Sequence, residues 1–263
     1  MASYAGELSP HQDAAVQVTD LHRSFNKAGG VLNGLDLEIA PGEFVALLGR
    51  SGSGKSTLLR ALAGLDRGVA GTGRVEVPAK VSVVFQDSRL LPWKRVLDNV
   101  VLGLRAGDAR ERGLQALAEV GLDGRDKAWP HELSGGEQQR AALARSLVRD
   151  PELLLADEPF GALDALTRIR MHTLLRKLCE VHQPAVLLVT HDVDEAIVLA
   201  DRVIVLDGGV VRHDARIELG TRRSQADPAF ARLRAQLLSE LGVEDDHDAP
   251  RPTAGRLSER AAS

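Results

Sequence analysis

The sequence lacks several features that would assign it to a particular class of protein. It contains a single cysteine among 263 residues, which excludes a disulfide framework and a cysteine-rich zinc site and fits a reducing compartment. It also lacks an excess of charge of one sign, with 33 basic and 37 acidic residues. Proteins that bind nucleic acid usually carry a basic excess, so we expect no nucleic-acid partner.

Long hydrophobic runs are missing as well. No apolar run approaches the roughly 20 residues that a membrane-spanning helix needs, and the first residues, MASYAGELSPHQD, have neither the basic nor the apolar region of a secretion signal. We therefore expect a chain that neither crosses a membrane nor is secreted, although it can still work against a membrane protein. Residues 1–14 and 244–263 lack apolar periodicity, and we expect both to be disordered tails of a single domain at 15–243.

Short aliphatic runs alternate with helical patterns along the chain. The runs at 43–49, 152–157 and 185–191 have no polar alternation, which is typical of strands buried on both faces of a parallel sheet. The stretches between them place apolar residues at helical spacing, so the chain reads as α/β. Residues from about 88 to 150 interrupt this alternation with mainly helical sequence, and we expect them to form a helical subdomain inserted into the core.

A glycine-rich segment follows the first of these buried strands and opens a helix. Its sequence, GRSGSGKST, fits the phosphate-loop pattern G-x-x-x-x-G-K-[ST]. In such loops backbone N–H groups surround the phosphates, the lysine reaches the β- and γ-phosphates, and the serine hydroxyl can bind magnesium. The alternative is a glycine-rich turn without a ligand. The predicted nucleotide-binding residues are Gly49, Arg50, Ser51, Gly52, Ser53, Gly54, Lys55, Ser56 and Thr57.

Two acids stand at the end of another buried strand, in LLLADE at 153–158. Ligands of open α/β sheets bind at strand ends, so we expect Asp157 to hold magnesium and Glu158 to polarise the water that attacks the γ-phosphate. Considered alone, the pair is better explained as two solvated acids that cap a strand before a turn at Pro159. The phosphate loop upstream favours the catalytic interpretation.

A third motif, LSGGEQQ, begins a strongly helical run. Ser134 and Glu137 form an S-x-x-E capping box, so a well-capped helix is the simplest interpretation. However, Gly135 and Gly136 expose backbone N–H groups at a helix N-terminus, which is a second anion-binding surface. One chain with two such surfaces suggests that a nucleotide is shared between two chains.

Taken together and in this order, the motifs resemble those of ABC-transporter ATPase subunits, from about Val16 to Asp207. The resemblance rests on GRSGSGKST, the glutamine after KVSVVF, LSGGEQQ, LLLADE, GALD and the histidine after AVLLVT. It implies a P-loop NTPase core with an N-terminal antiparallel β subdomain and the inserted helical subdomain. It also implies ATP and Mg²⁺ as cofactors, and a head-to-tail dimer with ATP between the phosphate loop of one copy and LSGG of the other.

The resemblance assigns roles to four further residues. It implies that Gln86 contacts magnesium or water and relays the state of the site to the membrane subunits, that Asp164 contacts the other copy, and that His191 touches the γ-phosphate. Phe25 stands where the family keeps an aromatic ring for adenine, which stacks on the ring face. The alternatives are an ordinary polar residue for Gln86, a hydrophobic staple of the N-terminal hairpin for Phe25, and for His191 a surface histidine before a D-x-x-E capping box at 192–195.

The helical insertion begins with DSRLLPWKRVLDNVVLGL, in which Trp93 suggests a groove for a partner protein or packing of the insertion onto the core. This run resembles the importer branch that serves nitrate, taurine and aliphatic sulfonates. Within that branch, the short spacing from Gly68 to Gln86, the segment DEPFGALDALTR at 157–168 and the brief tail together look most like the sulfonate importers. The implied role is that of a peripheral ATPase on the cytoplasmic face of the bacterial inner membrane, with permease subunits and, indirectly, a solute-binding protein. Import of taurine, nitrate or another small anion, or a soluble non-transport ABC ATPase, is the alternative.

Overall fold

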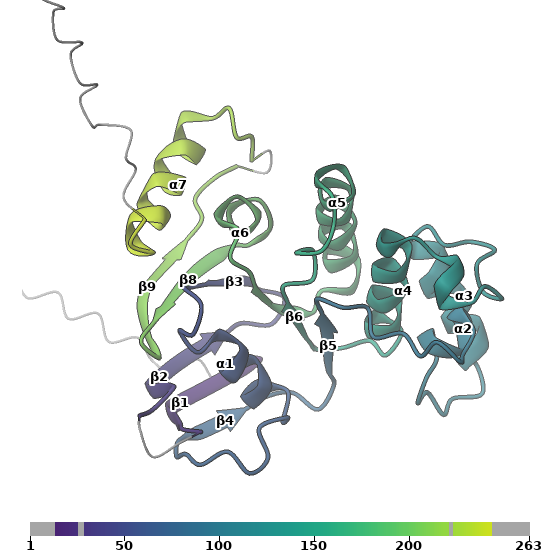
Figure 1. Ribbon diagram of the computed structural model, residues 1–263, viewed down its shortest axis with the longest axis horizontal. Helices are drawn as coiled ribbons and strands as arrows, with labels where there is room; N and C mark the ends of the chain where they lie inside the picture. Colours follow the sequence, from purple (N-terminus) through teal and green to yellow (C-terminus); the bar gives the residue numbers. More distant parts are fainter. Residues whose placement is uncertain (1–13, 26–28, 221–222, 244–263) are drawn as a thin grey trace, which may run out of the picture.

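The computed structural model describes residues 14–25, 29–220 and 223–243. The tail expected at 244–263, and all but the last residue of the tail expected at 1–14, lie outside the described residues. Two sheets and a set of helices make up the described part (Figure 1). No helix among the described residues is both long and apolar enough to cross a membrane.

The main sheet has six strands in the order β5-β6-β7-β3-β8-β9. All neighbours are parallel except β8 and β9, which form an antiparallel hairpin at one edge. The strand runs that were predicted from the sequence are therefore parallel neighbours, although β9 was not anticipated. The strands are β3 (Phe44–Leu48), β5 (Val81–Phe85), β6 (Leu153–Asp157), β7 (Ala185–Val189), β8 (Arg202–Asp207) and β9 (Val210–Arg216).

Each face of the main sheet packs on a different core, which explains the unbroken aliphatic runs. In β3, Val45 and Leu47 face the smaller sheet, whereas Ala46 and Leu48 face the other way. The smaller sheet is antiparallel, with the order β2-β1-β4, and consists of β1 (Val16–Arg23), β2 (Leu32–Ile39) and β4 (Arg74–Glu76). Helix α1 (Lys55–Leu62) contributes Leu58, Leu59 and Leu62 to the same core as these strands.

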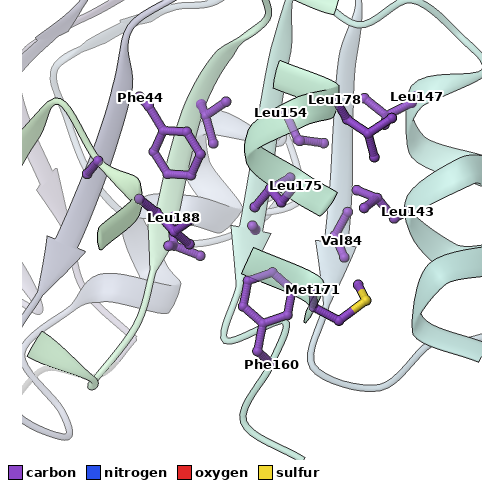
Figure 2. Packing of buried hydrophobic residues seen from close by; sticks show 14 of the residues in the cluster. Phe44, Val84, Leu143, Leu147, Leu154, Phe160, Met171, Leu175, Leu178 and Leu188 are labelled. Carbon is purple, nitrogen blue, oxygen red and sulfur yellow. The ribbon is translucent and has the colours of Figure 1, made fainter. Parts of the chain in front are cut away.

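The second core lies between the main sheet and the helices on its other face (Figure 2). Leu154 and Leu188 from the sheet pack with Leu175 and Leu178 from α5, and with Leu143 from α4. Burying one leucine side chain stabilises a fold by about 1.5–3 kcal/mol. The helices of this part of the chain are α2 (Val96–Val100), α3 (Ala109–Glu119), the 3₁₀ helix η1 (Pro130–Glu132), α4 (Gly135–Leu147), α5 (Ala165–His182), α6 (Val193–Leu199) and α7 (Pro228–Glu240).

Helices α2, α3 and α4 form a group beside the β5 edge of the main sheet, at the far right of Figure 1. They come from the segment in which a helical insertion was predicted. The α/β fold with a mainly parallel sheet, an N-terminal antiparallel sheet and a helical insertion is thus confirmed. The C-terminal helix α7, which packs on α6, was not anticipated from the sequence.

Candidate nucleotide-binding site

Most of the predicted site residues meet at the carboxyl edge of the main sheet. Gln86 follows β5, Asp157 ends β6, and the phosphate loop follows β3. His191 lies two residues beyond the end of β7. Because these strands are parallel and adjacent, their carboxyl ends open on one side of the sheet, where ligands of such folds bind.

The backbone of the phosphate loop depends on glycine. Gly54 stands just before α1 with a φ of 107°, a left-handed conformation that residues with a side chain rarely adopt. A Cβ atom at Gly54 would lie 2.9 Å from the carbonyl oxygen of Val31, and one at Gly49 would lie 2.4 Å from that of Leu206. The loop therefore passes too close to β2 and β8 for larger residues. Residues at the start of α1, from Lys55 to Thr57, line the cavity described below.

Lys55 is held inside the loop. Its Nζ donates hydrogen bonds to the carbonyl oxygens of Gly49 at 2.7 Å and Arg50 at 3.0 Å. Burial lowers the pKa of Lys55, and the nearby carboxylates of Glu158 and Asp157 partly oppose that shift. Among the described residues the buried hydroxyl of Ser53 has no hydrogen-bond partner. A buried cation and an unpaired hydroxyl in one loop are the groups that an anionic ligand would satisfy.

A cavity of about 360 Å³ lies over this loop. Glu158 and His191 line it together with the loop, and His191 Nδ1 is 3.3 Å from Glu158 Oε2. Glu158 adopts a left-handed backbone conformation with a φ of 46°, and its amide donates to the carbonyl of Val189 at 2.9 Å. The lining residues are Val31, Gly49, Ser51, Gly52, Gly54, Lys55, Ser56, Thr57, Glu158 and His191.

Three oxygen donors suited to magnesium come from neighbouring segments, although only Ser56 is among the residues that line the cavity, and Asp157 and Gln86 are not. The hydroxyl-bearing Ser56 lines the cavity, and Asp157 ends the neighbouring strand β6. Burial raises the pKa of Asp157, and the adjacent Glu158 carboxylate raises it further. The amide of Gln86 lies near Gly161, since a Cβ atom there would be 3.3 Å from Gln86 Nε2. A hydroxyl, a carboxylate and an amide fit Mg²⁺, which prefers oxygen ligands and takes others from phosphates and water.

The LSGG motif forms a second site at the start of α4. Ser134 Oγ accepts a hydrogen bond from the Glu137 amide at 3.3 Å, and Glu137 Oε2 accepts from the Ser134 amide at 2.9 Å. Both halves of the capping box are therefore present. Hydrogen bonds from Ser134, with help from Arg125 and Arg140, hold the pKa of Glu137 below its usual range. The first N–H groups of a helix have no partner within the helix, and the box satisfies only that of Glu137, which leaves those of Gly135 and Gly136 for a ligand.

A cavity of about 710 Å³ adjoins this helix N-terminus. It is lined by Ser134, Gly135, Gly136 and Glu137 and also by Asp164, which caps α5 by accepting from the Thr167 amide at 3.0 Å. The phosphate loop contributes no residue to this cavity, and LSGG contributes none to the first. In the described part of the chain the two anion-binding surfaces are thus separate.

Two placements differ from simple expectation. The ring of Phe25 is 53% exposed and lies outside the residues that line the first cavity, whereas Val31 lines it and was not predicted. An isolated valine before a strand carries no sequence signal for a ligand site. The expected capping box at 192–195 forms only in half: Asp192 accepts from the Glu195 amide at 3.1 Å, but the Glu195 carboxylate turns to Thr190 and His172 instead.

Comparisons with known proteins agree on one family. A sequence model of the family described as ABC transporter matches residues 32–161. The aliphatic sulfonates import ATP-binding protein SsuB 2 of Rhizobium johnstonii is 66% identical over 244 residues, which are 93% of this chain and 97% of the relative. The protein of the same name from Streptomyces avermitilis is 66% identical over 249 residues, or 95% and 98% of the two chains.

Solved structures agree as well. One is the ATP-binding cassette MJ0796 in a dimeric post-hydrolysis state bound to ADP and Pi. It matches with a TM-score of 0.67 and 32% sequence identity, and the match covers 78% of this chain and 100% of that chain. The cbiO1 protein of Clostridium perfringens, part of an ABC transporter complex, matches with a TM-score of 0.72 and 26% identity, over 79% and 90% of the two chains. By sequence, fold and the arrangement of its phosphate loop, this chain belongs to the ABC transporter family, as one of its ATP-binding proteins.

Proposed function

We propose that this chain is the ATP-hydrolysing subunit of an importer for aliphatic sulfonates. The observation that carries the ATPase role is the cavity in which a phosphate loop faces Glu158 and His191. The sulfonate substrate is supported by the names of relatives that are about two-thirds identical over nearly the whole chain, such as those of Rhizobium johnstonii and Streptomyces avermitilis. The ATPase itself supplies energy, and other subunits select the solute.

ATP binding follows from the chemistry of the loop. The β- and γ-phosphates lie over the N-terminus of α1, where backbone N–H groups and the helix dipole favour negative charge. Lys55, which now donates to two loop carbonyls, turns its ammonium group to the phosphate oxygens. Ser56, Asp157 and Gln86 are the residues that would hold a magnesium ion, which would supply further positive charge beside the phosphates. Phe25 offers an exposed ring face for the adenine.

Hydrolysis depends on the two residues opposite the loop. The Glu158 carboxylate accepts a hydrogen bond from a water molecule. This bond directs a lone pair of the water oxygen at the γ-phosphorus. His191, beside Glu158, donates to a γ-phosphate oxygen and stabilises the charge that develops there. The reaction forms a bond from the water oxygen to the γ-phosphorus and breaks the bond from that phosphorus to the oxygen that leaves with ADP. The proton lost by the water passes to the Glu158 carboxylate and from there to solvent.

The separation of the two anion-binding surfaces supports a dimer. In this arrangement Ser134, Gly135, Gly136 and Glu137 of a second copy cover the γ-phosphate that sits on the first copy's loop. Asp164, which lines the same cavity as LSGG, contacts the other copy. The solved cassette MJ0796 is a dimer bound to ADP and Pi, which supports this assembly by likeness.

The membrane partner is a permease, which the chain meets as a peripheral protein at the cytoplasmic face of the inner membrane. Trp93, near the start of the helical insertion, is 70% exposed, so it does not pack into the core and is free to contact a partner. Gln86 stands between β5 and the helical insertion, and its amide lies near Gly161, three residues after Glu158, so it is placed to relay the state of the site to this region. A solute-binding protein delivers the anion, and no nucleic acid takes part.

Growth of a deletion strain tests this function. With aliphatic sulfonates as the only sulfur source, we expect a strain without this gene to stop growing, and the wild-type gene but not a Lys55→Ala variant to restore growth. Growth on sulfate is the control for viability. Normal growth of the deletion strain on every sulfonate would contradict the proposal, and loss of growth on taurine or nitrate alone would reassign the substrate.

A further inference from the structure

A buried polar cluster contacts the residues that flank His191 in the chain. Glu195 on α6 is 5% exposed, and its Oε1 is 2.8 Å from Nε2 of His172 on α5. Its Oε2 accepts a hydrogen bond from the hydroxyl of Thr190, the residue before His191. A buried carboxylate is costly unless it is hydrogen-bonded, and both oxygens of this one are satisfied.

The residue after the histidine belongs to the same cluster. The Asp192 amide donates to Thr190 Oγ1 at 3.1 Å, and the Asp192 side chain accepts from the Glu195 amide at 3.1 Å. Arg168 donates to Asp192 at 3.3 Å and to the Leu163 carbonyl, also at 3.3 Å. Both neighbours of the histidine in the chain are therefore fixed by groups that lie outside the nucleotide cavity.

The cluster also contacts the segment that follows Glu158, the other candidate catalytic residue. The ring of His172 meets the ring of Phe160 edge-on, with centroids 5.1 Å apart and an interplanar angle of 64°. Phe160 stands two residues after Glu158 and is buried. Glu195 thus connects two segments of the site. Through His172 it contacts the segment that follows Glu158, and through Thr190 and Asp192 it contacts the residues on either side of His191.

From this geometry we infer that Glu195 is a positioning residue, which holds His191 in place against Glu158. Glu195 does not line the cavity as the described residues define it, so it acts through the histidine and not on ATP. Small misplacements of a reacting group cost large factors in rate. The inference rests on the proposed function, because it concerns the same ATPase site.

Steady-state hydrolysis by the purified full chain tests the inference. For Glu195→Ala we expect kcat to fall by about 10-fold or more while the KM for ATP stays within about twofold. Glu195→Gln should retain most activity, because its amide oxygen accepts from Thr190 and its amide nitrogen can donate to His172. The matched control is Asp194→Asn on the same helix, whose carboxylate pairs with Arg234 at 2.8 Å and should not affect kcat.

A double-mutant cycle separates positioning from a general structural role. If Glu195 acts through the histidine, adding Glu195→Ala to a His191→Ala protein should lower kcat no further. Should Glu195→Ala not fold, Thr190→Val removes the hydroxyl alone and should lower kcat with KM unchanged. The inference is overturned by a wild-type kcat in these variants, by equal losses in both backgrounds, or by a Gln variant as poor as the Ala variant. Failure of the proposed function would give a different result: either the wild-type chain does not hydrolyse ATP, or His191→Ala leaves its kcat unchanged.

Discussion

His191 Nδ1 lies 3.3 Å from Glu158 Oε2, although the two residues follow different strands. The contact arises because β6 and β7 are parallel neighbours in which Asp157 pairs with Val189, so the loops after both strands leave the sheet side by side. The histidine side chain is 67% exposed. A partly exposed pair of this kind contributes little to stability, about 0–1 kcal/mol, so exchanging the contact for one to a ligand costs the fold little.

The first prediction concerns this histidine. His191→Ala should leave ATP binding nearly unchanged and lower kcat by about 100-fold, since it removes a donor to the charge that develops on the γ-phosphate. His182→Ala is the control, because that histidine pairs with Glu119 at 2.9 Å, away from the cavity. Single-turnover hydrolysis and ATP binding by titration calorimetry measure the two effects. Equal hydrolysis by both variants would refute the assignment.

A second prediction follows from the raised pKa of Asp157. Burial makes the folded protein bind this proton more tightly than the unfolded chain does. The group therefore favours folding at pH values below its ordinary pKa of 3.8, and that contribution is lost as the pH rises through the higher folded value. At pH 7, Asp157→Asn should raise the thermal midpoint of the nucleotide-free protein by about 2 °C. The gain should shrink as the pH falls toward the ordinary pKa.

Differential scanning calorimetry across pH is the measurement. Asp207→Asn serves as the matched control, because Asp207 also ends a strand, β8, but lies 3.4 Å from Arg212 at the surface. An Asp157→Asn protein that is less stable than wild type at pH 7 would show that the carboxylate is not destabilised by its burial.

Glu137 should behave in the opposite way. Its pKa is lowered from 4.5 by hydrogen bonds from Ser134, so its contribution to stability is complete above the ordinary pKa and is lost as the pH falls through the lower folded value. Glu137→Gln keeps an acceptor for the capping box but removes the charge at the helix N-terminus. We expect a midpoint about 1 °C lower at pH 7, with no difference from wild type in acid. Thermal melts of Glu180→Gln, at an exposed position on α5, should show no such trend.

The dimer is tested at the LSGG motif. Ser134→Arg places a long cation at the N-terminus of α4 and should block ATP-driven dimerisation, while monomeric binding of ATP to the phosphate loop persists. Ser239→Arg, on the exposed side of α7, adds the same charge at a position that lines neither cavity. Light scattering with and without ATP distinguishes the two, and a normal dimer of the Ser134 variant would argue against the shared site.

Local patterns allowed the phosphate loop, the acids at the end of β6 and the capping box of Ser134 and Glu137 to be predicted from the sequence. Each of these depends on a few neighbouring residues, such as the glycine at 54, whose backbone conformation permits the loop. Contacts between distant segments could not be predicted. Glu195 follows the spacing of a helix cap, yet α5 packs on α6 and brings His172 within 2.8 Å of its carboxylate. Val31 likewise reaches the cavity only because β2 passes beside the loop.

The most direct test of the account is hydrolysis and dimerisation by Glu158→Gln. The variant should bind ATP and dimerise in its presence, because the amide keeps the size of the side chain, while turnover falls by at least about 100-fold. Glu152→Gln, just before the start of the same strand β6, is the matched control and should hydrolyse ATP normally. Loss of turnover in Glu158→Gln alone is the predicted result. Hydrolysis at the wild-type rate by that variant would contradict the account.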